Sequence, residues 1–287
     1  MIKPCEAILV NMGMINKTNY KVLNFIILVF IFIYIPVLLV RGEQPTSEVK
    51  KMLLTVGDTK REALVYIPST AKTKMSPLIF VFHGHGGTME NAYRSHQFEK
   101  LWPEAIIVYP QGLNTPGQLT DPQGKLPGWQ KEAGDMNDRD LNFFDQMLKT
   151  LQTNYKVDDQ RVYATGHSNG GGFTYLLWAT HADVFAAFAP SSAVSRKAAG
   201  KLKPKPAMHI MGEQDPLVKP EWQKMMCNMI LKVNSCDTDG KPYGEYATHY
   251  PSKSGNPVVL YVHPGGHVYP KEADEVVVKF FKEIKKK

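Results

Sequence analysis

The stretch ATGHSNGGGF, residues 164–173, contains the pattern G-x-S-x-G with Ser168 at its centre. Such a serine is either a nucleophile on a tight strand-to-helix turn or part of an ordinary glycine-rich loop. At an average usage of about 7% each for glycine and serine, the pattern arises by chance in roughly one chain in ten of this length. The surrounding sequence must decide, because a nucleophile needs a strand before it, a helix after it, and activating partners further along the chain.

Strand-like and helix-like segments alternate along the chain. Seven segments have the apolar character of strands: 61–68, 77–84, 105–112, 161–168, 186–193, 206–215 and 256–266. The continuously apolar run PLIFVFHG (77–84) is typical of a strand that is buried on both faces. Helical spacing marks residues 141–151, the segment after Ser168, and the C-terminal segment 271–285. This alternation predicts an α/β fold with a mainly parallel central sheet flanked by helices.

The N-terminal residues differ in kind from the rest. Residues 25–40, FIILVFIFIYIPVLLV, carry no charge, follow three lysines and lead to small residues, as in a secretory signal peptide. We therefore predict a signal peptide at 1–42 and one folded domain at 43–287, with the protein secreted or periplasmic. An uncleaved membrane anchor is the alternative, because the apolar run approaches the length that spans a bilayer. Met14 is an alternative start of the chain.

The composition of the 287-residue chain fits a globular domain, since 43% of the residues are hydrophobic. The formal net charge of +7 includes a basic N-terminal segment and gives no case for nucleic-acid binding. Cys227 and Cys236 are expected to form a disulfide in an oxidising compartment, with two separate buried thiols as the alternative. No set of cysteines and histidines has zinc spacing, so neither a metal nor a cofactor is predicted.

The residues needed to activate Ser168 follow it in a suitable order. A serine hydroxyl is a weak nucleophile unless a histidine takes its proton and a carboxylate orients that histidine. Asp215 follows a strand-like segment in the loop GEQDPLV, and His267 follows another in the loop PGGH. We predict that Ser168, His267 and Asp215 act as nucleophile, base and acid at one edge of the sheet. Glu213 is a weaker alternative for the acid, and His209, inside a strand, is interpreted as structural.

A glycine-rich loop upstream of Ser168 is a candidate for binding the negative oxygen of a tetrahedral intermediate. The loop HGHGGT, residues 83–88, follows a buried strand. In this arrangement one N–H comes from the residue after the nucleophile, here Asn169, and the other from such a loop. His85 is the predicted second donor and Gly86 the alternative. The two histidines of the loop lack a third ligand, so a metal site is not predicted there.

Several motifs resemble those of polyhydroxybutyrate depolymerase-type esterases, which are similar to feruloyl and acetylxylan esterases and belong to the α/β-hydrolases. The resemblance covers about residues 60–270 and rests on these segments: FVFHGHGGT, VYPQGLNTPG, GWQ, DRDLNFFDQML, VYATGHSNGGGFTYLLWA, FAAFAPSSA and GEQDPLV. It implies an α/β-hydrolase catalytic domain and maps the nucleophile, acid and base of the family onto Ser168, Asp215 and His267.

The resemblance also bears on the substrate side of the site. The loop 111–137 is long and rich in proline and glycine, and Trp129 in its GWQ motif is predicted to stack on the substrate. Packing of Trp129 against the loop itself is the alternative. The family often has threonine and tryptophan after the catalytic histidine, where this chain has Val268 and Tyr269. This difference leaves the base intact and changes the adjacent wall of the site.

The sequence thus predicts an exported serine ester hydrolase without a cofactor. Its partner is an ester substrate, either a polymer or a small ester, and a membrane only if the N-terminal segment stays uncleaved. By resemblance the substrate is a hydroxyalkanoate polyester, and the alternative is a feruloyl or acetyl ester of plant cell-wall polysaccharide. Two other functions are considered: a peptidase on the same fold, and an α/β-hydrolase-like binding protein without turnover.

Overall fold

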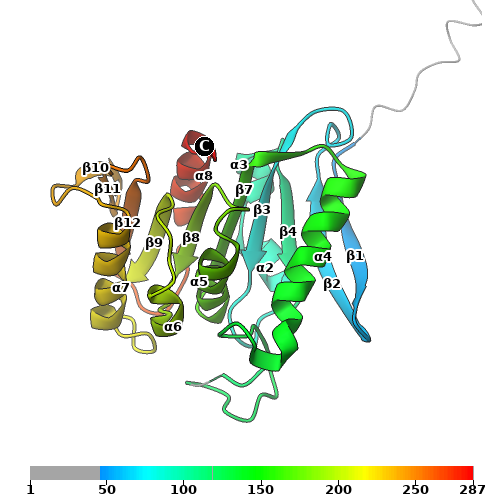
Figure 1. The fold of residues 1–287 in the computed structure, drawn as a ribbon, viewed down its shortest axis with the longest axis horizontal. Coiled ribbons are helices and arrows are strands. Elements are labelled where there is room, and N and C mark those ends of the chain that lie inside the picture. Colours follow the sequence, from blue (N-terminus) through cyan, green and yellow to red (C-terminus); the bar gives the residue numbers. More distant parts are fainter. Residues whose placement is uncertain (1–45, 118, 287) are drawn as a thin grey trace, which may run out of the picture. The chain divides into compact units, whose positions relative to one another are not determined.

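A ten-stranded sheet runs through the part of the chain that this computed structural model describes, residues 46–286 without residue 118 (Figure 1). Side by side, its strands are β1 (Glu48–Val56), β2 (Thr59–Ile67), β4 (Ile106–Pro110), β3 (Ser76–Phe82), β7 (Val157–His167), β8 (Ala187–Ser191), β9 (Ala207–Gly212), β12 (Val258–His263), β11 (Ala247–Tyr250) and β10 (Lys241–Gly244). The strands from β4 to β12 are parallel, and the pairs at the two edges are antiparallel. This arrangement confirms the predicted α/β fold.

Helices cover both faces of the sheet. They are α2 (Met89–Ser95), α3 (Phe98–Leu101), α4 (Arg139–Asn154), α5 (Asn169–His181), α6 (Arg196–Ala199), α7 (Pro220–Val233) and α8 (Ala273–Glu283). In Figure 1, α4, α5, α6 and α7 lie in front of the sheet, and α8 lies behind it. The strand β3 is buried along its whole length and contributes alternate residues to two hydrophobic cores, one on each face. This explains why its sequence is continuously apolar instead of alternating.

The strand β1 was not predicted from the sequence. It forms a hairpin with β2 at one edge of the sheet, with Glu48 opposite Ile67. Most of its side chains are exposed, and Lys50 and Lys51 lie among them. Met52, Leu54 and Val56 alternate toward the core, but the exposed Leu53 and the charged residues before it obscure this pattern in the sequence. Only one neighbouring strand holds this edge strand in place. Its pairing therefore depends on the hairpin more than on its own sequence.

The loops that carry the candidate residues all follow the carboxyl ends of parallel strands. The loop 83–88 follows β3, Ser168 follows β7, Asp215 follows β9, and His267 follows β12. Parallel strands end at the same edge of a sheet, where open α/β proteins bind their ligands. The segment 111–137 contains the short strands β5 (Leu113–Asn114) and β6 (Pro127–Gly128), which pair with each other in a separate two-stranded sheet. A 3₁₀ turn, Asp135–Asp138, then leads into α4.

The predicted signal peptide at 1–42, its alternative as an uncleaved anchor, and the alternative start at Met14 lie outside the described residues and stay predictions. Within residues 46–286, no helix is long and apolar enough to cross a bilayer. The part of the predicted domain 43–287 that is described forms one unit.

The start of α5 is packed so closely against β3 that alanine is expected not to fit at position 170. A Cβ atom on Gly170 would lie 2.3 Å from the backbone oxygen of Phe82 and 2.6 Å from that of His83. Because both neighbours are backbone atoms, we expect Gly170→Ala to lower the free energy of unfolding by about 3 kcal/mol, measured by denaturant titration.

Gly172 is a matched control in the same helix, because a Cβ atom there would meet nothing within 4 Å. Gly172→Ala should raise stability by about 0.5–1 kcal/mol through the reduced entropy of the unfolded chain. Equal effects of the two substitutions would contradict the close packing of α5 on β3.

Candidate active site

Ser168 lies on a sharp turn between β7 and α5, in a backbone conformation that is rare for a residue with a side chain. Its φ is 56° and its ψ is −118°. Such a conformation costs about 1–3 kcal/mol and persists only where the surrounding structure holds it. The Ser168 N–H donates to the carbonyl oxygen of Ser191 at 2.8 Å, and close packing of Gly170 holds the other side. The strand–turn–helix context that a nucleophile requires is therefore present.

The three residues predicted to act together form a continuous hydrogen-bonded chain. The Ser168 Oγ atom lies 2.8 Å from His267 Nε2, and His267 Nδ1 lies 2.8 Å from Asp215 Oδ2. A carboxylate only accepts hydrogen bonds, so His267 carries its proton on Nδ1 and donates it to Asp215. His267 Nε2 is then free to accept the Ser168 hydroxyl proton. This is the tautomer that a base for a serine nucleophile requires.

Asp215 is held by more donors than His267 alone. Its side chain is fully buried. One oxygen, Oδ1, accepts from the backbone N–H groups of Leu217 and Val218, each at 2.9 Å. The other oxygen, Oδ2, accepts from His267 and from the amide nitrogen of Gln223, the latter at 3.0 Å. Each carboxylate oxygen thus has two donors, which fixes the plane of the carboxylate as well as its position.

The weaker alternative for the acid, Glu213, has an exposed side chain and belongs to none of these hydrogen bonds. The two residues differ in burial although they are only two positions apart, since Asp215 turns inward beneath the start of α7. The geometry therefore favours Asp215 over Glu213.

Both residues predicted to bind the negative oxygen have a backbone N–H group without an acceptor among the described residues. One is Asn169, the first residue of α5, and the other is His85. The alternative donor, Gly86, already donates to the carbonyl oxygen of Pro127 at 2.7 Å. The loop lies beside the serine, since a Cβ atom on Gly84 would be 3.6 Å from Ser168 Cβ. Of the two loop residues considered, His85 is therefore the one with an N–H group available to a ligand.

The structure corrects the prediction for Trp129. Its side chain is completely buried, stacks on Phe173 and contacts Phe82 edge to face. Its indole N–H donates to the carbonyl oxygen of His83 at 2.9 Å. A ring enclosed in this way cannot stack on a substrate, and the alternative, in which Trp129 packs its loop down, describes the structure.

Trp129 also connects its loop to the turn that bears the serine. The backbone N–H of Trp129 donates to Asn169 Oδ1 at 2.7 Å, and Asn169 Nδ2 donates back to the Trp129 carbonyl oxygen at 3.2 Å. The side chain of Asn169 thus holds the loop, while its backbone N–H has no acceptor among the described residues. This second role of Asn169 was not predicted from the sequence, because it depends on a residue 40 positions away.

The predicted disulfide is also corrected, because Cys227 and Cys236 are both free thiols. Cys227 is buried on the inner face of α7, and Cys236 follows the end of that helix, near the carbonyl oxygen of Asn256. Burial raises the pKa of the Cys227 thiol to about 12 and that of the Cys236 thiol to about 11. Both groups are therefore protonated at neutral pH and weakly reactive.

Three histidines near the site have structural contacts. His83 ties two loops together, since its Nδ1 atom lies 2.7 Å from the Gly84 carbonyl oxygen and its Nε2 accepts from the Gly112 N–H at 2.9 Å. His167 packs against the His267 ring, and burial and the neighbouring His267 lower its pKa to about 3. His85 Nε2 contacts Asp121 Oδ2 at 3.2 Å. Among the described residues no group of three potential ligands is placed to hold a metal ion.

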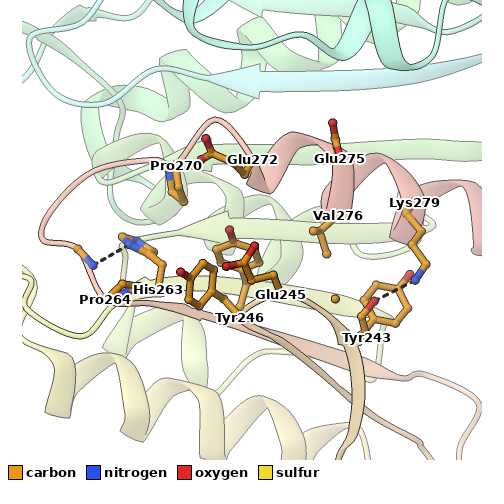
Figure 2. A pocket seen from close by; sticks show the side chains of 13 residues that line it. Tyr243, Glu245, Tyr246, His263, Pro264, Pro270, Glu272, Glu275, Val276 and Lys279 are labelled. Carbon is orange, nitrogen blue, oxygen red and sulfur yellow. Dashed lines mark hydrogen bonds between the residues drawn. The ribbon is translucent and has the colours of Figure 1, made fainter.

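A cavity of about 770 Å³ lies beside the site and not over it. It is bounded by the turn between β10 and β11, the end of β12 and the first half of α8 (Figure 2). Figure 2 shows Tyr246, His263 and Glu272 around it. Ser168, Asp215 and His267 are not among its lining residues. The chemistry of the triad and this cavity are therefore separate features of the structure.

Comparisons with known proteins identify the family to which the chain belongs. A family model named Esterase and described as "Putative esterase" matches residues 55–263, which include Ser168 and Asp215. The chain is 28% identical over 244 residues to feruloyl esterase C of Emericella nidulans, covering 79% of this chain and 82% of that one. It is 27% identical over 216 residues to the bifunctional acetylxylan esterase/xylanase XynS20E of Neocallimastix patriciarum. That match covers 72% of this chain but only 29% of the relative.

Solved structures show the same fold. An acetyl xylan esterase from Aspergillus awamori superimposes with a TM-score of 0.61 at 14% identity, covering 81% of this chain and 99% of that one. The feruloyl esterase module from Clostridium thermocellum, complexed with sinapinate, superimposes with a TM-score of 0.57 at 13% identity. The match covers 84% of this chain and 88% of that one. At these identities the likeness concerns the architecture, and it is that of the α/β-hydrolases.

Proposed function

Because the chain belongs to the Esterase family of carboxylic ester hydrolases, we propose that Ser168, His267 and Asp215 are its catalytic triad and that it cleaves feruloyl or acetyl esters of polysaccharides. The observation that carries the proposal is the unbroken chain of two 2.8 Å hydrogen bonds from Ser168 through His267 to Asp215. Each of the three residues follows a different parallel strand, so their meeting depends on the whole sheet.

The proposed reaction proceeds through an acyl-enzyme. Ser168 Oγ attacks the ester carbonyl carbon while His267 Nε2 takes the hydroxyl proton, and Asp215 stabilises the resulting imidazolium. The N–H groups of Asn169 and His85 donate to the negative oxygen of the tetrahedral intermediate. His267 then gives its proton to the leaving alcohol as the carbon–oxygen bond breaks. A water molecule, deprotonated by His267, attacks the acyl-enzyme and releases the acid and Ser168.

The substrate class is inferred from the relatives and from apolar side chains near the triad. The relatives are named as feruloyl and acetylxylan esterases, so they favour cell-wall esters over the polyester that the motifs first suggested. Leu217 follows Asp215 by two positions and Val268 follows His267 directly, with exposures of 40% and 54%. Leu126, 46% exposed, lies next to Gly86 of the loop 83–88. Exposed apolar side chains suit a ring or a methyl group of an acyl chain.

A substrate panel tests the proposal. We expect methyl ferulate or acetylated xylan to be hydrolysed with a kcat/KM at least about tenfold above that for 3-hydroxybutyrate oligomers. The exposed apolar side chains suit an aromatic ring or a methyl group better than a hydroxylated acyl chain, and one methylene of apolar contact changes kcat/KM by about 10–200-fold. Release of ferulate, acetate and hydroxybutyrate would be measured under identical conditions. Faster hydrolysis of the hydroxybutyrate oligomers would overturn the substrate class, and failure to hydrolyse any ester would overturn the proposed function itself.

A further inference from the structure

Behind Asp215, three buried side chains continue the hydrogen-bonded chain into the interior. The amide nitrogen of Gln223 lies 3.0 Å from Asp215 Oδ2, and the Gln223 Oε1 atom lies 3.2 Å from His209 Nε2. His209 Nδ1 lies 2.6 Å from the hydroxyl of Tyr175. These three residues come from α7, β9 and α5 and have no exposed surface. Figure 1 shows α5 and α7 on the same face of the sheet, over the region of β8 and β9.

The direction of every hydrogen bond in this chain follows from its acceptors. The nitrogen of the Gln223 amide faces two oxygens, Asp215 Oδ2 and the Val218 carbonyl at 2.7 Å. Both only accept, so the NH₂ group must point toward them and Oε1 must point toward His209. His209 consequently donates from Nε2, and its Nδ1 accepts the hydroxyl proton of Tyr175.

Burial keeps this arrangement unchanged over the ordinary pH range. It lowers the pKa of His209 to about 4, so the imidazole is neutral at neutral pH with one donor and one acceptor. It also raises the pKa of Tyr175 well above its usual value, so the phenol keeps its proton. All the donors of the chain therefore point toward Asp215.

We propose that Gln223 is a positioning residue for the catalytic step, held in place by His209 and Tyr175, and that it acts by fixing Asp215 Oδ2 beneath His267. The proposal rests on the proposed function, since it assigns Gln223 to the same triad. Asp215 Oδ2 is the oxygen that accepts the His267 Nδ1 proton, and Gln223 is its only other donor among the described residues. Loss of this donor removes one of the two hydrogen bonds that hold that oxygen, so its position relative to His267 Nδ1 is less restrained.

A purely structural role is the competing explanation, because buried amides also stabilise folds. The two explanations differ in what they change. A structural role alters the fraction of folded enzyme and leaves the folded enzyme unchanged. If Gln223 has a positioning role, replacing it lowers kcat of the folded enzyme at constant KM. The same replacement does not lower kcat further in an enzyme whose Asp215 can no longer orient His267.

The main experiment combines Gln223→Leu with Asp215→Asn. For p-nitrophenyl acetate we expect Gln223→Leu alone to lower kcat by about ten- to hundredfold with KM unchanged within about twofold, because a small misplacement of a catalytic group can cost about a hundredfold in rate. In the Asp215→Asn background, Gln223→Leu should lower kcat by less than about twofold. An equal fold-decrease in kcat in the wild-type and Asp215→Asn backgrounds would overturn the proposal. Full kcat of the folded Gln223→Leu enzyme would overturn it as well.

Tyr175→Phe provides a milder variant in case Gln223→Leu does not fold, since it removes a single hydroxyl. We expect it to lower kcat by about threefold, because it acts on Asp215 through two intervening residues. Tyr163→Phe is the matched control: this buried tyrosine also donates one hydrogen bond, to the Ile284 carbonyl oxygen at 2.6 Å, away from the triad. Its melting temperature should fall and its kcat should not. Equal kcat for the two variants would overturn the proposal.

The outcome separates this inference from the proposed function. If Ser168→Ala is inactive while Gln223→Leu retains full kcat, the triad stands and only the role of Gln223 is lost. If Ser168→Ala retains activity, the proposed function itself fails.

Discussion

Replacing Ser168 by alanine is expected to lower kcat/KM for p-nitrophenyl acetate by about 10⁴-fold or more, because removing the nucleophile of a triad removes the acyl-enzyme pathway. The hydroxyl contributes one hydrogen bond, to His267, and the backbone turn is held by contacts that the substitution leaves in place. Stability should therefore change little, and the melting temperature of the variant should stay near that of the wild type.

A fluorophosphonate probe gives a direct measurement of the same residue. An activated serine displaces fluoride and forms an oxygen–phosphorus bond, and mass spectrometry should locate the adduct on Ser168. Ser195→Ala is a suitable control, since the Ser195 hydroxyl caps α6 by accepting from the Ala198 N–H. It should retain wild-type activity and labelling. Persistent hydrolysis by Ser168→Ala at the wild-type rate would show that the chemistry lies elsewhere.

Asp215→Asn is expected to lower kcat by about 10⁴-fold, and the structure indicates why the isosteric amide fails. The Oδ1 position faces two backbone donors, from Leu217 and Val218, so the oxygen of asparagine must occupy it. The NH₂ group then takes the Oδ2 position and donates to His267 Nδ1. The proton of the imidazole moves to Nε2, which faces Ser168 and can no longer accept its hydroxyl proton.

Glu213→Gln is the matched control for this prediction, because Glu213 carries the same charge two residues away and is exposed. Its kcat should stay within about twofold of the wild type, since an exposed charge is screened by solvent. The test is steady-state hydrolysis of p-nitrophenyl acetate by both variants. If Glu213→Gln lost as much activity as Asp215→Asn, the assignment of the acid would have to be reversed.

The sequence predicted the fold well because the parallel strands have an unambiguous signature. β3, β4, β8 and β9 are buried along their whole length and read as apolar runs between helical segments. The order Ser168, Asp215, His267 then located each candidate residue after the end of a strand. Such positions can be predicted because the end of a strand is a local feature of the sequence, and the carboxyl ends of parallel strands lie at the same edge of the sheet.

Features that depend on packing between segments distant in the sequence could not be predicted from local patterns. The position of Trp129 in a glycine-containing loop suggested that it stacks on the substrate, yet its side chain is buried against Phe173 and Phe82. Two cysteines in an oxidising compartment predict a disulfide between Cys227 and Cys236, yet both are free. A loop has no periodicity to reveal which side chains point inward, and cysteine spacing does not reveal the direction of the thiols.

By itself, the sequence determined the α/β architecture and the places where a nucleophile, an acid and a base could stand, because these follow from local periodicity and from the ends of strands. Only the tertiary structure decided that His267 lies within hydrogen-bonding distance of both Ser168 and Asp215, and that Gln223, His209 and Tyr175 stand behind Asp215. Those contacts join residues far apart in the chain. Their geometry is fixed by the packing of α5 and α7 against the central strands of the sheet, and no single segment of sequence records it.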